Sequence, residues 1–295
     1  MTSSTAPTSA DAEYGGGVYH RYEPHKAGLP NLRVYFRELW RRREFASEMS
    51  KAGMRGANSM TFFGQAWLVI NPLLLAAVYY LLIVVIGPSR SRGFDRELFA
   101  HLTGGLFIFY YFQGAVSSGA GSVVGAGKLI LNTAFPRLLM PLSAVRTGFF
   151  RFLPTVPVYL VFHVLAGNPW NLNTLVTAPV FVVLISMFAA GLAAVFAALQ
   201  VYFRDTSSFL PYIMRIWLYS SPVLWMVRQL PDHWISQLVK INPLYSLIGG
   251  YGEALQKGIM PSLELWLLAI FWAVLSCVLG FGYFISRERD FAVRL

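Results

Sequence analysis

The sequence predicts an all-α integral membrane protein with six transmembrane helices. Between Leu98 and Arg204 the chain contains neither Asp nor Glu, although a soluble surface needs charges of both signs. Hydrophobic residues make up 56% of the 295 residues and charged residues only 13%, and the mean hydropathy is +0.52. Soluble domains carry about 25% charged residues. This composition therefore favours a bilayer, where a charge at the centre of a helix costs about 2.5–3.5 kcal/mol.

Six apolar blocks are long enough to cross a membrane, for which a helix needs about 20 residues. They span residues 66–86, 98–118, about 138–166, about 175–203, 209–227 and 263–285. The third and fourth blocks exceed the bilayer thickness, so we expect tilt or a kink there. Pro154 and Pro157 are the expected kink points in the third block, because proline interrupts helical hydrogen bonds.

The residues before the first block divide into two parts. Residues 1–28 are small, polar and rich in glycine, so we expect a disordered cytoplasmic tail before a transmembrane domain at 29–295. Residues 31–45 predict an amphipathic helix in the cytoplasmic interface, with Trp40 on its apolar face and basic residues on another. The basic residues are Arg33, Arg37 and Arg41. A surface helix docked on a soluble partner is the alternative.

Between the fifth and sixth blocks, residues 233–258 are moderately apolar. We expect Asn242-Pro243 and Gly249-Gly250 to break this segment into pieces too short to cross. The segment therefore predicts two short extracytoplasmic gate helices that dip back toward the outer face. An ordinary external loop with amphipathic helices is the alternative.

Lysine and arginine predict the orientation of the chain. Most of the 24 Lys and Arg residues lie on one side of the membrane if both termini are cytoplasmic, as the positive-inside rule requires of a multi-pass plasma membrane protein. Arg90, Arg92 and Arg96 do not fit, because they fall in an outer loop. Basic membrane flanks thus explain the net charge of +10, and no nucleic acid partner is expected.

Catalytic and metal-binding patterns are absent from the sequence. The segment around Gly127-Lys128 fails as a phosphate loop, since Ser122 stands where glycine is required and Leu129 where Ser or Thr is required. Cys277 is the single cysteine, and no residue spacing indicates a metal site. We therefore expect a protein that is not an enzyme and does not hydrolyse ATP by itself.

Several short motifs follow one another in a defined order along the chain. They are Asn71-Pro72-Leu73, Phe135-Pro136-Arg137 with Pro141-Leu142 shortly after it, Tyr202-Phe203-Arg204-Asp205, Asn242-Pro243-Leu244 and Glu288-Arg289-Asp290-Phe291. The ordered set resembles the ABC-2 type permeases, most closely those that export O-antigen, teichoic acid, galactan and related bacterial polysaccharides. The resemblance covers roughly residues 30–295.

The resemblance implies a half-transporter without a cofactor of its own. Two copies of such a permease, a homodimer, pair with two copies of a separate ATPase, which binds ATP and Mg²⁺. The connector after the second block would form a coupling helix that docks on this ATPase. Its candidate residues are Lys128, Asn132, Phe135, Pro136 and Arg137. The alternative interpretation of Phe135-Pro136-Arg137 is a helix start with an arginine that reaches the headgroups.

Aromatic side chains crowd the first, second and fifth blocks. Sugar rings stack their C–H faces on aromatic rings, so these side chains are candidates for the wall of a glycan channel. They are Tyr79, Tyr80, Phe109, Tyr110, Trp217, Tyr219 and Trp225. Aromatic residues also gather at lipid interfaces, which is the alternative for each of them.

Arg146 and Arg151 lie near or inside the third block without an acidic neighbour in the sequence. Arginine suits phosphate oxygens, so both are candidates for binding the diphosphate or headgroup of a lipid-linked polymer. The alternative for both is contact with the headgroups of membrane lipids.

Together these features predict the membrane-spanning subunit of an ATP-driven exporter that moves a lipid-linked polysaccharide out of the cytoplasm, with cell-wall galactan as the candidate polymer. A permease of the same superfamily that exports drugs or lipids is an alternative. An ion-coupled secondary transporter would normally place a carboxylate within a span. A membrane enzyme would need an acid, a metal cluster or an activated nucleophile.

Overall fold

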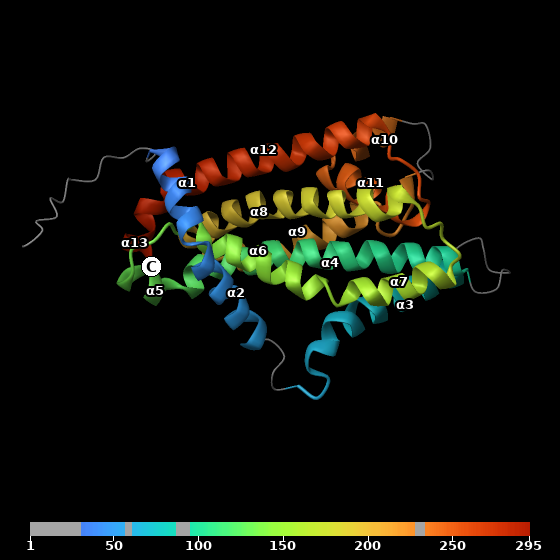
Figure 1. Ribbon diagram of the computed structural model, residues 1–295, viewed down its shortest axis with the longest axis horizontal. Helices are drawn as coiled ribbons and strands as arrows, with labels where there is room; N and C mark the ends of the chain where they lie inside the picture. The colour runs from blue at the N-terminus through green and yellow to red at the C-terminus, as the bar shows by residue number, and fades with distance from the viewer. Residues whose placement is uncertain (1–30, 57–60, 87–94, 228–233) are drawn as a thin grey trace, which may run out of the picture.

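The computed structural model describes residues 31–56, 61–86, 95–227 and 234–295, and these residues are almost entirely helical, with no strand among them (Figure 1). The all-α class is therefore confirmed. The expected tail at 1–28, like Arg90 and Arg92, lies outside the described residues. The main helices are α1 (Leu32–Arg41), α2 (Arg43–Gly56), α3 (Trp67–Ile86), α4 (Arg96–Gly125), α5 (Gly127–Asn132), α6 (Leu139–Phe152), α7 (Thr155–Leu165), α8 (Ala178–Tyr202), α9 (Thr206–Ser220), α10 (Trp234–Ile241), α11 (Pro243–Gln256), α12 (Leu263–Arg287) and α13 (Phe291–Arg294).

Helix α8 lies at the centre of the bundle and packs against both α4 and α12, while α6 packs against α4 and also contacts α8. Small residues allow the close approach of these helices. The backbone of Gly191 in α8 faces Ser276 and Gly280 in α12, so a Cβ atom on Gly280 would collide with the Gly191 backbone. A Cβ atom on Gly119 of α4 would likewise collide with Ala193 of α8. Helices α4, α8 and α12 therefore form a tightly packed unit.

Three described helices are long and apolar enough to span a membrane, namely Gly64–Val84, Asn173–Tyr202 and Leu263–Asp290. Helices α6 and α7 become a fourth if they count as one span, bent by 41° at the break between them. This break falls at Pro154, so the predicted kink is confirmed there, whereas Pro157 lies inside α7. Six spans remain a prediction, because neither α4, which contains the second block, nor α9, which has only 15 residues, is among these span-length apolar helices.

The predicted single helix over residues 31–45 is wrong in its extent. The chain turns at Arg42, where the backbone leaves the helical region between α1 and α2. The Arg42 side chain explains the turn, since its Nε donates to Glu38 at 2.6 Å and its Nη1 donates to the carbonyl oxygen of Ala134 at 2.5 Å. Helix α2 then runs along α6.

The segment before α12 does contain two short helices, α10 and α11, which separate at Asn242 as expected. The Asn242 side chain accepts a hydrogen bond from the Leu244 backbone and caps α11. The predicted break at Gly249-Gly250 is wrong, because both glycines lie buried inside α11. Gly250 faces the ring of Phe181, and a side chain there would strike that ring. These glycines therefore permit close packing rather than ending a helix.

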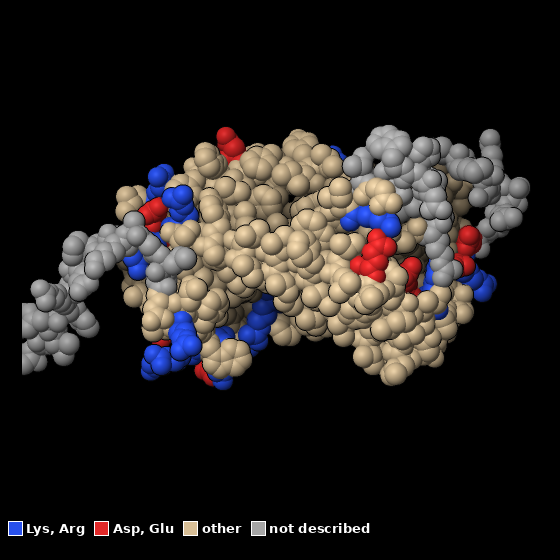
Figure 2. All heavy atoms as spheres, turned by 90° about the horizontal axis from the view of Figure 1, so that it is seen from above, with Lys and Arg blue, Asp and Glu red and all other residues tan. Residues whose placement is uncertain are grey.

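The bundle has two distinct ends. Helices α1, α5 and α13 lie together at one end, which we call the connector end, and α10 lies toward the opposite gate end (Figure 1). On the face shown in Figure 2, charged side chains gather toward these two ends and the surface between them is largely uncharged. This distribution is typical of a protein whose middle is embedded in lipid.

Candidate functional site

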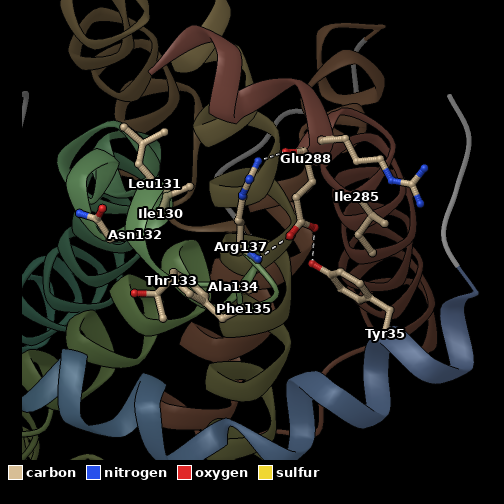
Figure 3. Close-up of a pocket in the computed structure, with 11 residues that line it drawn as sticks. Tyr35, Ile130, Leu131, Asn132, Thr133, Ala134, Phe135, Arg137, Ile285 and Glu288 are labelled. Atoms are coloured by element: carbon tan, nitrogen blue, oxygen red, sulfur yellow. Dashed lines mark hydrogen bonds between the residues drawn. The ribbon is translucent and has the colours of Figure 1, made fainter. Parts of the chain in front are cut away.

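The connector between α4 and α6 meets two distant parts of the chain at the connector end (Figure 3). A cavity of about 490 Å³ lies there, lined by α1, by the connector and by the end of α12. Its lining residues include Tyr35, Asn132, Phe135, Arg137, Ile285 and Glu288. The site therefore combines residues from the beginning, the middle and the end of the sequence.

Glu288 holds the three parts together. Its carboxylate accepts a hydrogen bond from the backbone N–H of Arg137 and one from the hydroxyl of Tyr35, each at 2.5 Å. The guanidinium of Arg137 in turn donates to the carbonyl oxygen of Glu288. Hydrogen bonds to a charged group are stronger than neutral ones, so Glu288 joins α1 and the connector to the end of α12.

Tyr35 is suited to this role by its surroundings. Burial, together with the nearby Glu288 carboxylate, raises the pKa of the Tyr35 hydroxyl well above its ordinary value. The hydroxyl therefore keeps its proton at neutral pH and acts as the donor to Glu288.

A second set of contacts holds the connector from the side of α1 and α2. Arg42 donates to the carbonyl oxygen of Ala134, and the ring of Phe45 packs on that of Phe135 with centroids 5.1 Å apart. Pro136 is buried beside them. The connector is thus clamped between the N-terminal helices and the C-terminal segment.

The short helix α5 presents a different surface. Ile130 is buried, whereas Lys128, Leu131 and Asn132 are exposed. The Asn132 side chain donates to the carbonyl oxygen of Lys128 at 2.8 Å and closes the last turn. The five predicted coupling residues therefore fall into two groups. Lys128 and Asn132 face outward, and Phe135, Pro136 and Arg137 fix the connector to the bundle.

Sequence reasoning missed the residues that complete this site, namely Tyr35, Arg42, Leu131 and Glu288. Glu288 stood in a quoted motif, but nothing local assigns it a role. Its partners are 151 and 253 positions away. Leu131 is 56% exposed, on a short helix that follows Gly125, begins at Gly127 and precedes Pro136.

Part of the predicted aromatic set forms a second cluster. The hydroxyl oxygens of Tyr79 and Tyr219 lie 3.5 Å apart, with the rings edge to face. Tyr110 interacts electrostatically with both tyrosines, and Arg215 interacts with Tyr79 and Tyr110. Tyr219 is 52% exposed, so this cluster, from α3, α4 and α9, reaches the surface of the bundle.

The other predicted aromatics occupy different places. Phe109 has no exposed surface, so in this conformation it supports the core and does not face a passage. Trp217 packs on Phe112 with ring centroids 5.7 Å apart. Tyr80 accepts a hydrogen bond from the backbone of Asp95 at 2.6 Å, and the indole N–H of Trp225 donates to the carbonyl oxygen of Tyr219 at 3.3 Å.

The structure separates the two predicted headgroup arginines. The guanidinium of Arg146 lies over the ring of Phe150, 5.4 Å from its centroid. Arg151 lines a cavity between α3, α4 and α6, and it donates to the carbonyl oxygen of Gly53 at 3.0 Å. Of the two arginines, Arg151 lines this cavity and Arg146 does not.

Helix α1 carries the predicted interfacial residues on its surface. Arg33, Arg37 and Arg41 are exposed, and Trp40 is 68% exposed, with the guanidinium of Arg43 5.1 Å from its ring centroid. Leu32 and Phe36 are also exposed. Several apolar side chains of α1 are thus exposed, and the contact of α1 with the membrane interface stays a prediction.

Known proteins resemble this chain over most of its length. An O-antigen export system permease protein RfbA of Klebsiella pneumoniae is 29% identical over 230 residues, which cover 78% of this chain and 86% of the relative. A second from the same organism is 26% identical over 232 residues, covering 79% and 87%. One from Myxococcus xanthus is 28% identical over 260 residues, covering 87% of this chain and 97% of the relative.

The family model described as "ABC-2 type transporter" matches residues 48–255. The match begins in α2, includes the whole connector and ends in α11. Together with the span-length apolar helices, it makes this a multi-pass protein of the plasma membrane. The chain belongs to the ABC-2 type transporter family.

Proposed function

We propose that this chain is the membrane subunit of an ATP-driven exporter that carries a lipid-linked polysaccharide from the cytoplasm across the plasma membrane. Cell-wall galactan is the candidate polymer. The observation that carries the proposal is the clamped connector with its exposed face on α5, since a permease driven from outside needs a rigid contact for its motor. The names of the O-antigen export permeases that it resembles support the substrate class.

In this proposal, two copies of the chain pair with two copies of a separate ATPase that binds ATP and Mg²⁺. Lys128, Leu131 and Asn132 contact the ATPase. Its movement reaches α6 through Pro136 and Arg137, and it reaches α12 through the bonds of Arg137 to Glu288. These contacts thus transmit a movement of the ATPase at α5 to several helices of the bundle.

The polymer passes along the aromatic surface formed by Tyr79, Tyr110 and Tyr219, with Trp217 and Trp225 behind it. Tyrosine rings offer apolar faces to the sugar rings, and their hydroxyls offer hydrogen bonds to the sugar hydroxyls. A path of this kind holds a polar polymer weakly enough to let it slide.

The connector end faces the cytoplasm in this arrangement, so both termini are cytoplasmic. Helix α1 lies in the membrane interface, with Trp40 in the lipid and Arg33, Arg37 and Arg41 near the phosphates. The gate helices α10 and α11 then lie on the outer side.

Purification of the chain in mild detergent from cells that also express the ATPase tests the proposal. We expect a stoichiometric ATPase subunit to accompany the wild-type chain and to be lost with Leu131→Asp. Leu172→Asp is the matched control, because Leu172 is 74% exposed between α7 and α8, far from α5 in sequence. ATP hydrolysis by the chain alone, or transport driven by a proton gradient without an ATPase, would contradict it.

The same complex separates the two candidate cargo classes. In a polysaccharide exporter, lipid-linked glycan changes the ATPase rate, whereas in a drug or lipid exporter small amphipathic compounds do so and the glycan has no effect.

A further inference from the structure

A small cavity lies beside the bend between α6 and α7. Its volume is about 230 Å³, and α3, α4 and α6 contribute to its wall. The polar and aromatic groups that line it include Trp67, Asn71, Tyr110, Ser118, Thr147 and Arg151. One arginine therefore shares this cavity with an amide, three small hydroxyls and five aromatic rings.

Arg151 is incompletely satisfied in this space. Its Nη2 donates to the carbonyl oxygen of Gly53, but its Nε is buried without a hydrogen-bond partner among the described residues. None of the ion pairs in the described part of the chain includes Arg151, and no Asp or Glu occurs between Leu98 and Arg204. A cation without a counter-charge in an apolar setting is destabilising unless an anion joins it.

Arg146 provides an internal comparison on the same helix. Its guanidinium lies over the ring of Phe150, and it does not line the cavity. An aromatic face partly stabilises a cation, so the Arg146 guanidinium has an aromatic partner, whereas the Nε of Arg151 has no hydrogen-bond partner among the described residues.

The size of the cavity limits what can occupy it. Sites for drug-sized ligands have volumes of about 300–1,000 Å³, so a space of about 230 Å³ fits a small anionic group and not a sugar chain. Arginine and small hydroxyl or amide groups are the usual partners of phosphate oxygens. The rings of Trp67 and Tyr110 supply an apolar wall for the first carbons of an attached lipid chain.

We propose that Arg151 and this cavity bind the phosphate group of the lipid carrier, and thereby the attached end of the cargo. This inference rests on the proposed function, because the carrier of a lipid-linked cargo ends in such a group. The other lining groups position the phosphate against the Arg151 guanidinium.

Binding of farnesyl diphosphate to the full-length chain in mild detergent tests this site, with farnesol and inorganic diphosphate as the comparison ligands. We expect farnesyl diphosphate to bind more tightly than either. Arg151→Gln should weaken it by about tenfold or more, as expected for the loss of a charge-assisted hydrogen bond. Arg151→Lys, which keeps the charge, should weaken it less, and Arg146→Gln should leave it unchanged.

Three results would overturn the proposal. Unchanged affinity in Arg151→Gln would remove this residue from the site. If farnesol binds as tightly as farnesyl diphosphate, the phosphate does not contribute to binding. If inorganic diphosphate binds as tightly, the lipid chain does not contribute. If Arg151→Gln does not fold, Ser118→Leu, which fills the cavity and keeps the charge, must abolish binding instead. Co-purification of the ATPase separates the two proposals. If only the phosphate site is wrong, the ATPase still co-purifies with Arg151→Lys, whereas failure of the proposed function means that no ATPase accompanies even the wild-type chain.

Discussion

The carboxylate of Glu288 accepts a hydrogen bond from the hydroxyl of Tyr35, although the two residues are 253 positions apart. The same carboxylate binds the backbone of Arg137. A single side chain thus fixes the position of the connector relative to both ends of the described chain, and its removal has a calculable effect.

Tyr35→Phe should lower the free energy of unfolding by about 1.5–3 kcal/mol, the usual contribution of a hydrogen bond to a charged group. Glu288→Ala should lower it further, because the Arg137 N–H also loses its acceptor. Thermal unfolding in detergent measures both. Since the pKa of Tyr35 is raised, the tyrosine keeps its proton up to the ordinary tyrosine pKa of about 10, and the contribution is lost as pH rises above that value. The contribution also falls at low pH, because protonation of the Glu288 carboxylate removes the charge on the acceptor. A Tyr35→Phe difference that disappears between pH 6 and pH 9 would argue against this assignment.

Phe135→Ala should reduce transport more than ATP hydrolysis. The substitution removes the ring that packs on Phe45, so the connector can move without carrying the bundle with it. Loss of a buried phenylalanine ring costs about 3–5 kcal/mol in a full core, and we expect less here because Phe135 is only partly buried. Phe135→Leu should restore most of the transport per ATP hydrolysed. Equal losses of both activities in Phe135→Ala would mean that the residue serves only stability.

Gly280→Ala and Gly282→Ala form a matched pair on α12. The first adds a Cβ atom against the backbone of Gly191, whereas the second adds it to open space. Overpacking typically costs about 1–3 kcal/mol, and backbone yields less readily than a side chain. Gly280→Ala should therefore lower the yield of folded protein and its unfolding temperature, while Gly282→Ala matches the wild type. The two variants behaving alike would refute the close contact of α8 and α12.

Tyr219→Ala should slow export of the polymer several-fold without lowering stability, because Tyr219 is half exposed. Tyr219→Phe keeps the ring and loses only the hydroxyl that faces Tyr79, so it should retain most of the transport. Phe271→Ala on α12 is the control, since this ring is 54% exposed outside the tyrosine cluster. Export in vesicles loaded with the permease and its ATPase measures the three rates.

The sequence predicts the helical class and the positions of most helices, because long apolar runs free of acidic residues have few other structures available. It also predicts the bend at Pro154 and the end of α10 at Asn242, because Pro154 and Pro243 interrupt a helix through their own backbone and need no distant partner. The interruption at Arg42 escapes prediction, since it depends on a carbonyl oxygen in the connector. Gly250 misleads for the same reason, because its role is set by the ring of Phe181.

The candidate site shows the same division. The Phe135-Pro136-Arg137 motif identifies the connector, but the partners that hold it are far away in the sequence. Glu288, flanked by Arg287 and Arg289, looks like one charge in a basic tail. Its role follows only from the packing of α12 against α8, which brings the end of α12 beside the connector.

The close contact of α8 with α12 restricts how these two helices can move relative to each other, whereas α3 is less constrained. Where glycine backbones touch without side chains between them, the two helices cannot slide or rotate independently. About 61% of the apolar stretch of α8 is buried, against 11% of that of α3. Gating motions within one protomer should therefore be movements of α3 and its neighbours relative to α8 and α12, which keep their mutual arrangement.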